Sequence, residues 1–159
     1  MTDGSVQVLG FAGSLRAGSF NRMLLRAAQA LAPAQVNVTI HDLAPIPLYN
    51  FDVEQQGDPE PVRVFKENIA AADAVLVVTP EYQQGVPGVL KNALDWASRP
   101  PGKSALRDKP VAIMGATPGR MMTVRAQTQL RQMPGYNSCF LVSHSGCEPI
   151  GVPVLHKAR

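Results

Sequence analysis

The stretch from Val75 to Arg99 constrains the fold of this chain more than any other part of it. It begins with a continuous apolar run, Val75–Val78, which is typical of a strand buried on both faces of a parallel sheet. Thr79-Pro80 ends that strand, because a proline cannot donate a hydrogen bond to a neighbouring strand. After a polar turn with glycines and prolines, apolar residues recur at helical spacing from Val89 onward. The stretch therefore predicts a strand, a loop and a helix, and the loop Pro80–Pro87 lies where open parallel sheets bind ligands.

The rest of the chain repeats this alternation of strand and helix. Helical periodicity covers 59–72 and 122–133, and an earlier helix ends before Pro33 with the apolar stripe Met23, Leu24, Ala27, Ala28 and Leu31. Residues 43–58 are rich in Pro, Asn and Asp and predict a loop. The five strands are predicted at 6–11, 35–41, 75–78, 111–114 and 139–142. The pattern predicts an α/β fold in one domain over residues 1–159: a doubly wound, parallel, five-stranded sheet with helices on both faces.

The composition narrows the class of protein further. Of 159 residues, 45% are hydrophobic and 17% are charged, which is a globular balance. No apolar run approaches the roughly 20 residues of a membrane span, and no secretory signal is recognised, so we expect a cytoplasmic protein without a membrane partner. Cys139 and Cys147 have neither metal-binding nor redox spacing. A net charge of +3 without a basic run argues against nucleic-acid binding.

A loop rich in hydroxyl groups follows the first predicted strand, from Gly13 to Asn21. Its glycine spacing imitates a nucleotide-binding P-loop, but Ser19 stands where that motif requires a lysine, which disfavours nucleotide hydrolysis. The loop still offers hydroxyl groups, the Arg16 guanidinium and the N–H groups of a helix start, which together suit a terminal phosphate. The alternative is that Ser19 only caps the helix and that Arg16 is solvated.

Three segments together resemble the NADPH-dependent FMN reductase family. They read GSLRAGSFN, TPEYQQGVPGVLKNALDWASRP and GATPGR, and the resemblance extends over about residues 6 to 142. It implies a flavodoxin-like fold, bound FMN, and NADPH or NADH as co-substrate. The implied reaction is a ping-pong transfer of hydride to FMN and then of electrons to quinones or other small acceptors, such as chromate, azo dyes or free flavin.

The resemblance also implies which residues form the cofactor site. The phosphate would be held by Ser14, Arg16, Ser19, Phe20 and Asn21; the isoalloxazine ring would be lined by Pro80, Glu81, Tyr82 and Gln83; Thr117 and Gly119 would complete the pocket.

The sequence departs from the family at three places. Gln83 stands where the family usually has asparagine, and Thr117 replaces a usual serine. The tail, residues 143–159, lacks the family's last helix, and Pro149 and Pro153 oppose helix formation there. We therefore expect a divergent or shortened C-terminus that leaves one face of the sheet to a neighbouring subunit or uncovered.

Several side-chain roles stay open at this point. We expect no catalytic side chain and no metal site, because the flavin supplies the redox chemistry and the histidines have no ligand spacing. Glu81 suits either proton transfer or orientation of its turn, and Tyr82 suits either the ring edge or packing. Arg120 and Arg125 would meet a nicotinamide-nucleotide phosphate or stay solvated. We expect a homodimer or homotetramer in which Trp96 is a packing or subunit contact.

Two alternative functions remain beside an FMN reductase. The first is a flavodoxin-like carrier that binds FMN but takes its electrons from a protein partner. The second is an altered relative that dimerises but holds flavin poorly, an alternative that only the unusual tail supports. A net charge of +3 counts against the carrier, since such proteins profit from an acidic docking face.

Overall fold

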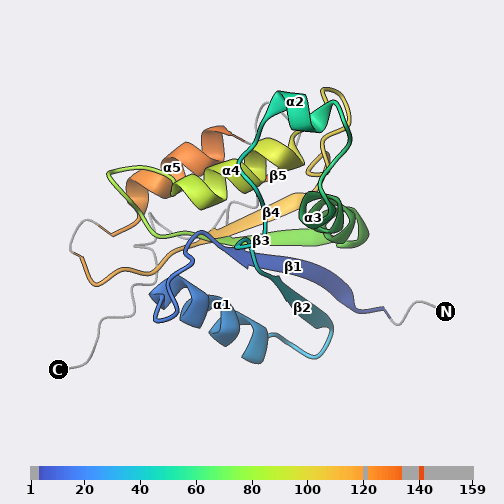
Figure 1. Cartoon of the computed structure of the whole chain (residues 1–159). Helices are drawn as coiled ribbons and strands as arrows, with labels where there is room; N and C mark the ends of the chain where they lie inside the picture. The colour runs from blue at the N-terminus through green and yellow to red at the C-terminus, as the bar shows by residue number, and fades with distance from the viewer. Residues whose placement is uncertain (1–3, 120–121, 134–139, 142–159) are drawn as a thin grey trace.

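The computed structural model describes residues 4–119, 122–133 and 140–141. Five parallel strands form one sheet in the order β2-β1-β3-β4-β5, as Figure 1 shows. The predicted doubly wound parallel sheet is therefore confirmed. The fifth strand is only two residues long in the described part of the chain. The strands are β1 (Val6–Ala12), β2 (Val36–His41), β3 (Ala74–Val78), β4 (Pro110–Met114) and β5 (Phe140–Leu141).

Helices lie on both faces of this sheet. In Figure 1, α1 (Phe20–Ala30) lies on one face, and α3 (Glu60–Ala71), α4 (Gly88–Ala97) and α5 (Val124–Gln132) lie on the other. A short helix, α2 (Phe51–Glu54), falls within residues 43–58, where the sequence predicted only a loop. The prediction of a loop was wrong there because a helix-capping contact forms the first turn of α2. The Asn50 side chain accepts a hydrogen bond from the Asp52 N–H at 2.9 Å.

The central strand is buried as its apolar sequence predicted. Residues Val75–Val78 of β3 are all buried, because helices cover both faces of the sheet: Val75 and Val77 pack in the core with α3 and α4, and Leu76 and Val78 pack against α1. Phe11 of β1 and Ile113 of β4 both lie opposite Val77 in the ladder. The first, third and fourth strands therefore end at one edge of the sheet.

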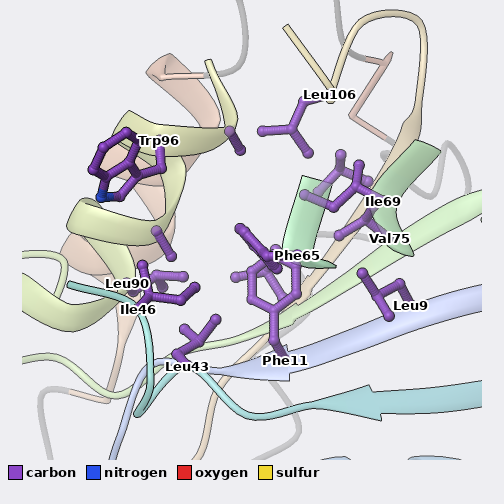
Figure 2. Close-up of a cluster of buried hydrophobic side chains, with 14 of the residues drawn as sticks. Leu9, Phe11, Leu43, Ile46, Phe65, Ile69, Val75, Leu90, Trp96 and Leu106 are labelled. Atoms are coloured by element: carbon purple, nitrogen blue, oxygen red, sulfur yellow. The ribbon is translucent and has the colours of Figure 1, made fainter. Parts of the chain in front are cut away.

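The main hydrophobic core lies between the sheet and helices α3 and α4 (Figure 2). Phe11 of the sheet meets Phe65 of α3 edge to face, with ring centroids 5.3 Å apart. Trp96 of α4 is 0% exposed, and its indole N–H donates to the Pro47 carbonyl oxygen at 2.9 Å. Trp96 is thus a core residue that ties residues 43–50 to α4. Of the two roles that the sequence left open for it, packing and subunit contact, the structure shows packing.

The α1 face differs from the stripe predicted for it. Leu24 and Leu25 are buried against the sheet, whereas Met23 and Leu31 of the predicted stripe are 48% and 83% exposed. An apolar groove of about 210 Å³ runs between α1 and residues 116–118.

The predicted tail, residues 143–159, lies outside the described residues, as do Cys139, Cys147 and Arg120. No helix in the described ranges combines the length and apolar character needed to cross a membrane.

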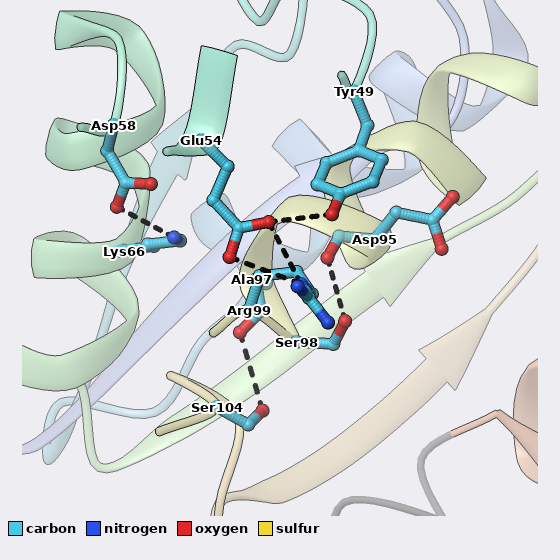
Figure 3. A network of polar contacts seen from close by, with 9 residues as sticks. All are labelled: Tyr49, Glu54, Asp58, Lys66, Asp95, Ala97, Ser98, Arg99 and Ser104. Atoms are coloured by element: carbon cyan, nitrogen blue, oxygen red, sulfur yellow. Dashed lines mark hydrogen bonds and ion pairs between the residues drawn. The ribbon is translucent and has the colours of Figure 1, made fainter. Parts of the chain in front are cut away.

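A polar network fixes α2 to the C-terminal end of α4 (Figure 3). The Glu54 carboxylate accepts a hydrogen bond from the Tyr49 hydroxyl at 2.6 Å and pairs with the Arg99 guanidinium at 3.0 Å. The hydrogen bond from Tyr49 lowers the pKa of Glu54; burial opposes this shift, and Arg99 adds to it. The same hydrogen bond raises the pKa of Tyr49. Lys66 and Asp58 form a second ion pair beside this network.

Candidate flavin site

Three loops meet at the carboxyl edge of the sheet, after β1, β3 and β4. The chain leaves β1 for α1 on one face and leaves β3 for α4 on the other, so the crevice between these strands is the switch point of the fold. The loops approach closely at Gly115, where an added Cβ would lie 2.7 Å from the Thr79 carbonyl oxygen. Only glycine fits there without moving the second loop.

The first loop combines a helix cap with an exposed cation. The Ser19 hydroxyl accepts hydrogen bonds from the N–H groups of Asn21 and Arg22, at 3.2 and 3.3 Å, and so caps α1. Arg16 is exposed to solvent in the same loop, and Phe20 begins the helix. Ser19 therefore caps α1, and the N–H groups of the helix start that it orders are suited to an anion.

Asn21 joins the first loop to the third. Its side-chain amide donates to the Ala116 carbonyl oxygen and its side-chain oxygen accepts from the Ala116 N–H, both at 2.9 Å. Asn21 is only 2% exposed. The amide thus pairs with the backbone of residue 116 in both directions, and its role is to hold two loops in register.

The second loop contacts the first through a pair of hydroxyl groups. The buried Ser14 hydroxyl lies 3.0 Å from the Tyr82 hydroxyl, which allows a hydrogen bond in either direction. Tyr82 is otherwise 52% exposed, and Pro80 just before it is buried. Gln83 follows with a positive φ of 45°. These contacts place the predicted phosphate loop and the predicted ring loop side by side.

Glu81 points to α5. One of its carboxylate oxygens accepts from the N–H groups of Arg125 and Ala126, at 2.9 and 3.2 Å. The Arg125 guanidinium is 3.8 Å from the other oxygen and about half exposed. Of the two roles that the sequence left open for Glu81, the structure shows the orienting one.

The third loop closes the site on the α1 side. The Thr117 hydroxyl accepts a hydrogen bond from the Gly119 N–H at 3.1 Å, which shapes a tight local turn. Thr117 is half-buried and Gly119 is exposed. A threonine here forms the same hydroxyl contact with the backbone that a serine would form.

Sequence reasoning missed Gln129, which lies on α5 but contacts the second loop. Its side-chain oxygen accepts a hydrogen bond from the Val86 N–H at 2.8 Å. No sequence signal marks it, because a glutamine on the polar side of a helix is ordinary and its partner lies 43 residues away. His41, at the end of β2, contacts Asn68 and Phe65 of α3, and burial lowers its pKa. Within the described ranges, no group of acidic, Cys and His residues is placed to hold a metal.

The residues at this edge fit FMN, which is a planar ring with a phosphate tail. Hydroxyl groups, the Arg16 guanidinium and the start of α1 provide the donors that a phosphate needs. Large apolar side chains lie exposed beside them: Leu15, Phe20 and Tyr82 are 48%, 37% and 52% exposed. Pockets of this composition, mostly apolar with a few converging polar groups, suit small cofactors.

A doubly wound parallel sheet in the order β2-β1-β3-β4-β5, whose first loop lacks the P-loop lysine, is typical of flavodoxin-like proteins. The sequence matches the profile of the NADPH-dependent FMN reductases over residues 6–146, and the chain belongs to this family. It is 51% identical to an NAD(P)H-dependent FMN reductase of Pseudomonas aeruginosa, over 80% of this chain and 68% of that protein. A 2-hydroxy-1,4-benzoquinone reductase of Burkholderia is 47% identical, over 82% of this chain and 71% of that one.

Solved structures agree with this assignment. FerB, a flavoenzyme NAD(P)H:(acceptor) oxidoreductase from Paracoccus denitrificans, superposes with a TM-score of 0.83 at 34% sequence identity. The match covers 89% of this chain and 78% of FerB. The flavodoxin-like fold implied by the sequence resemblance is therefore confirmed.

Proposed function

We propose that this protein is an FMN-dependent NAD(P)H oxidoreductase that reduces quinones and other small acceptors. The observation that carries the proposal is the junction of three family-typical loops, joined through Asn21–Ala116 and Ser14–Tyr82, at the switch point of the sheet. Its relatives named FMN reductase and quinone reductase support both the cofactor and the acceptor class. Chromate, azo dyes and free flavin are further acceptors to test.

The proposed roles divide the residues of the site into three groups. Arg16 and the capped start of α1 bind the phosphate, with Ser14 and Phe20 beside it. Asn21 and Ser19 act by holding this loop in shape. The ring is lined by the backbone and side chains of residues 80–83 and closed by Thr117 and Gly119, which together exclude water from one face. Bound FMN would accept a hydride from the nicotinamide and release electrons to the second substrate in the same space.

The two alternative functions make different predictions from this one. An FMN carrier would bind flavin but would not oxidise NADPH without a protein partner, and the net charge of +3 still counts against it. An altered relative would not retain FMN. The intact contacts between the three loops favour a flavin-binding protein over that alternative.

We further propose that the protein acts in the cytoplasm as a homodimer or homotetramer. Leu48, Phe51 and Val53, before and within α2, are 83%, 50% and 37% exposed and are an apolar surface suited to a subunit contact. Light scattering over a dilution series tests the assembly, and Leu48→Asp should shift it toward monomers. A wild-type monomer at every concentration would contradict this part of the proposal.

Steady-state kinetics test the activity. Purified protein loaded with FMN should oxidise NADPH or NADH when a benzoquinone is the only acceptor, at a rate that is proportional to enzyme concentration. A yellow protein that oxidises neither nucleotide would support the carrier instead. A survey of acceptors with both nucleotides would then define the preferred substrates.

A further inference from the structure

The second loop contains a tight turn that its own sequence does not favour. Tyr82 and Gly85 form an antiparallel bridge with two backbone hydrogen bonds of 3.1 Å. The two residues between them, Gln83 and Gln84, have φ angles of 45° and 64°. Such turns favour Asn-Gly, because side chains with a Cβ are strained in the left-handed region. The Gln-Gln pair therefore needs support from outside the turn.

That support comes from α5, on both sides of the turn. Just before the turn, the Glu81 carboxylate accepts from the Arg125 and Ala126 N–H groups, and its side chain is only 9% exposed. Just after the turn, the Val86 N–H donates to the Gln129 side-chain oxygen at 2.8 Å. The two contacts lie about one helical turn apart on α5 and hold the two ends of the bridge.

The first of these contacts also completes the helix. Thr123, the residue at the N-terminus of α5, forms no side-chain capping bond, and the first turn of α5 contains no acidic residue. Glu81 supplies both the missing acceptor and a negative charge at the positive end of the helix. Helix and turn thus stabilise each other.

The second contact is shaped by Gly85. A Cβ added at that position would lie 3.0 Å from the Gln129 side-chain oxygen. The amide of Gln129 therefore lies directly against the backbone of the turn, in the space that a side chain at residue 85 would fill. Its hydrogen bond to Val86 depends on this close approach.

We propose that Gln129, together with Glu81, is a positioning residue that holds the Tyr82–Gly85 turn in the conformation that contacts the flavin ring. The inference rests on the proposed function, since it assigns the ring to this loop. It makes recognition of the ring, but not of the phosphate, depend on α5. Gln129 acts only through the backbone of Val86.

Separate titrations with FMN and riboflavin test this, because riboflavin has the ring but no phosphate. Gln129→Leu should raise the Kd of apo-protein for both ligands by the same factor, about 3- to 10-fold for one hydrogen bond. Gln129→Asn, whose amide is one methylene too short, should do the same. Gln132→Leu, an exposed glutamine on the same helix, is the matched control and should bind both ligands as the wild type does.

A second substitution tests the strain itself. Gln84→Gly relieves the left-handed residue, so it should restore ring binding to within about twofold when combined with Gln129→Leu. Unchanged riboflavin affinity in Gln129→Leu and Gln129→Asn would overturn the inference, as would a loss confined to FMN. Failure of Gln84→Gly to rescue would also overturn it. If wild-type protein binds neither ligand, the proposed function fails instead.

Discussion

The two ends of α4 are held in different ways. Its C-terminal end lies against a nearly buried carboxylate, because Glu54 is paired with Arg99 and hydrogen-bonded to Tyr49. Its N-terminal end follows the second loop, in which Tyr82 is 52% exposed and contacts the first loop through one pair of hydroxyl groups. We therefore expect the C-terminal end to serve stability and the loop before the N-terminal end to serve binding. Substitutions should therefore separate the two properties.

The largest effect is expected in the core beside the Glu54 network. Trp96→Ala removes a side chain that is 0% exposed and its hydrogen bond to Pro47. It should lower the free energy of unfolding by about 3–5 kcal/mol, as measured by urea denaturation. Leu31→Ala, which truncates a side chain that is also 83% exposed, is the control and should have little effect. If Trp96→Ala only dissociated subunits and left the unfolding energy unchanged, the core assignment would be wrong.

The second largest effect should be on stability and FMN binding together, since Asn21 belongs both to the candidate site and to the buried interior. Asn21→Ala leaves the N–H and carbonyl groups of Ala116 without their side-chain partner. We expect a loss of about 2–4 kcal/mol in stability together with weaker FMN binding. Denaturation and FMN titration of the same preparation would show this. A variant that lost affinity at full stability would mean that Asn21 contacts the phosphate directly.

Arg16→Ala should affect binding alone. Arg16 is exposed, so its loss leaves the fold intact, but one charge-assisted contact to the FMN phosphate is worth about 1.5–3 kcal/mol. Riboflavin affinity should not change. Ser19→Ala differs, because it also removes the cap of α1 and should lower stability by about 1 kcal/mol. Equal losses for FMN and riboflavin in Arg16→Ala would contradict the phosphate role.

The smallest effect concerns the pH dependence of stability. The hydrogen bond from Tyr49 holds the pKa of Glu54 below its ordinary 4.5. The contribution of ionised Glu54 to the stability of the fold is therefore complete above pH 4.5 and is lost as the pH falls through the lowered pKa. The pKa of Tyr49 is raised above 10.0, so its contribution is lost as the pH rises through the raised value. Thermal melting from pH 3 to 7 should show a shallower acid loss in Glu54→Gln than in the wild type. If the melting temperatures of the variant and the wild type fell in parallel with pH, the Glu54 network would be excluded as the cause of the acid loss of stability.

Patterns within one segment were predictable from sequence. The apolar run Val75–Val78 predicted a strand buried on both faces, and a helix cap was one of the two roles that the sequence left open for Ser19. Contacts between distant segments were not predictable. Asn21 meets a backbone 95 residues away, and Glu81 caps a helix 44 residues ahead. Neither partner is marked by any periodicity, because each bond depends on how the loops meet once the sheet has formed.

The sequence left two roles open for Trp96, packing and subunit contact, for a related reason. Its helical spacing is compatible with either a core or a subunit contact, and the choice depends on residues 43–50 covering that side of α4. The same holds for α1, where Leu25 lies in the core while Met23 is exposed. Helical periodicity identifies an apolar stripe, but the partner elements decide which part of it is covered.

Titration of the apo-protein with FMN and riboflavin tests the central claim most directly, namely that the three loops form a flavin site with a phosphate-binding first loop. We predict one FMN per chain and a riboflavin affinity weaker by at least about tenfold, because riboflavin lacks the phosphate that Arg16 and the start of α1 are proposed to bind. Equal affinities for the two ligands, or no FMN binding by folded protein, would contradict it.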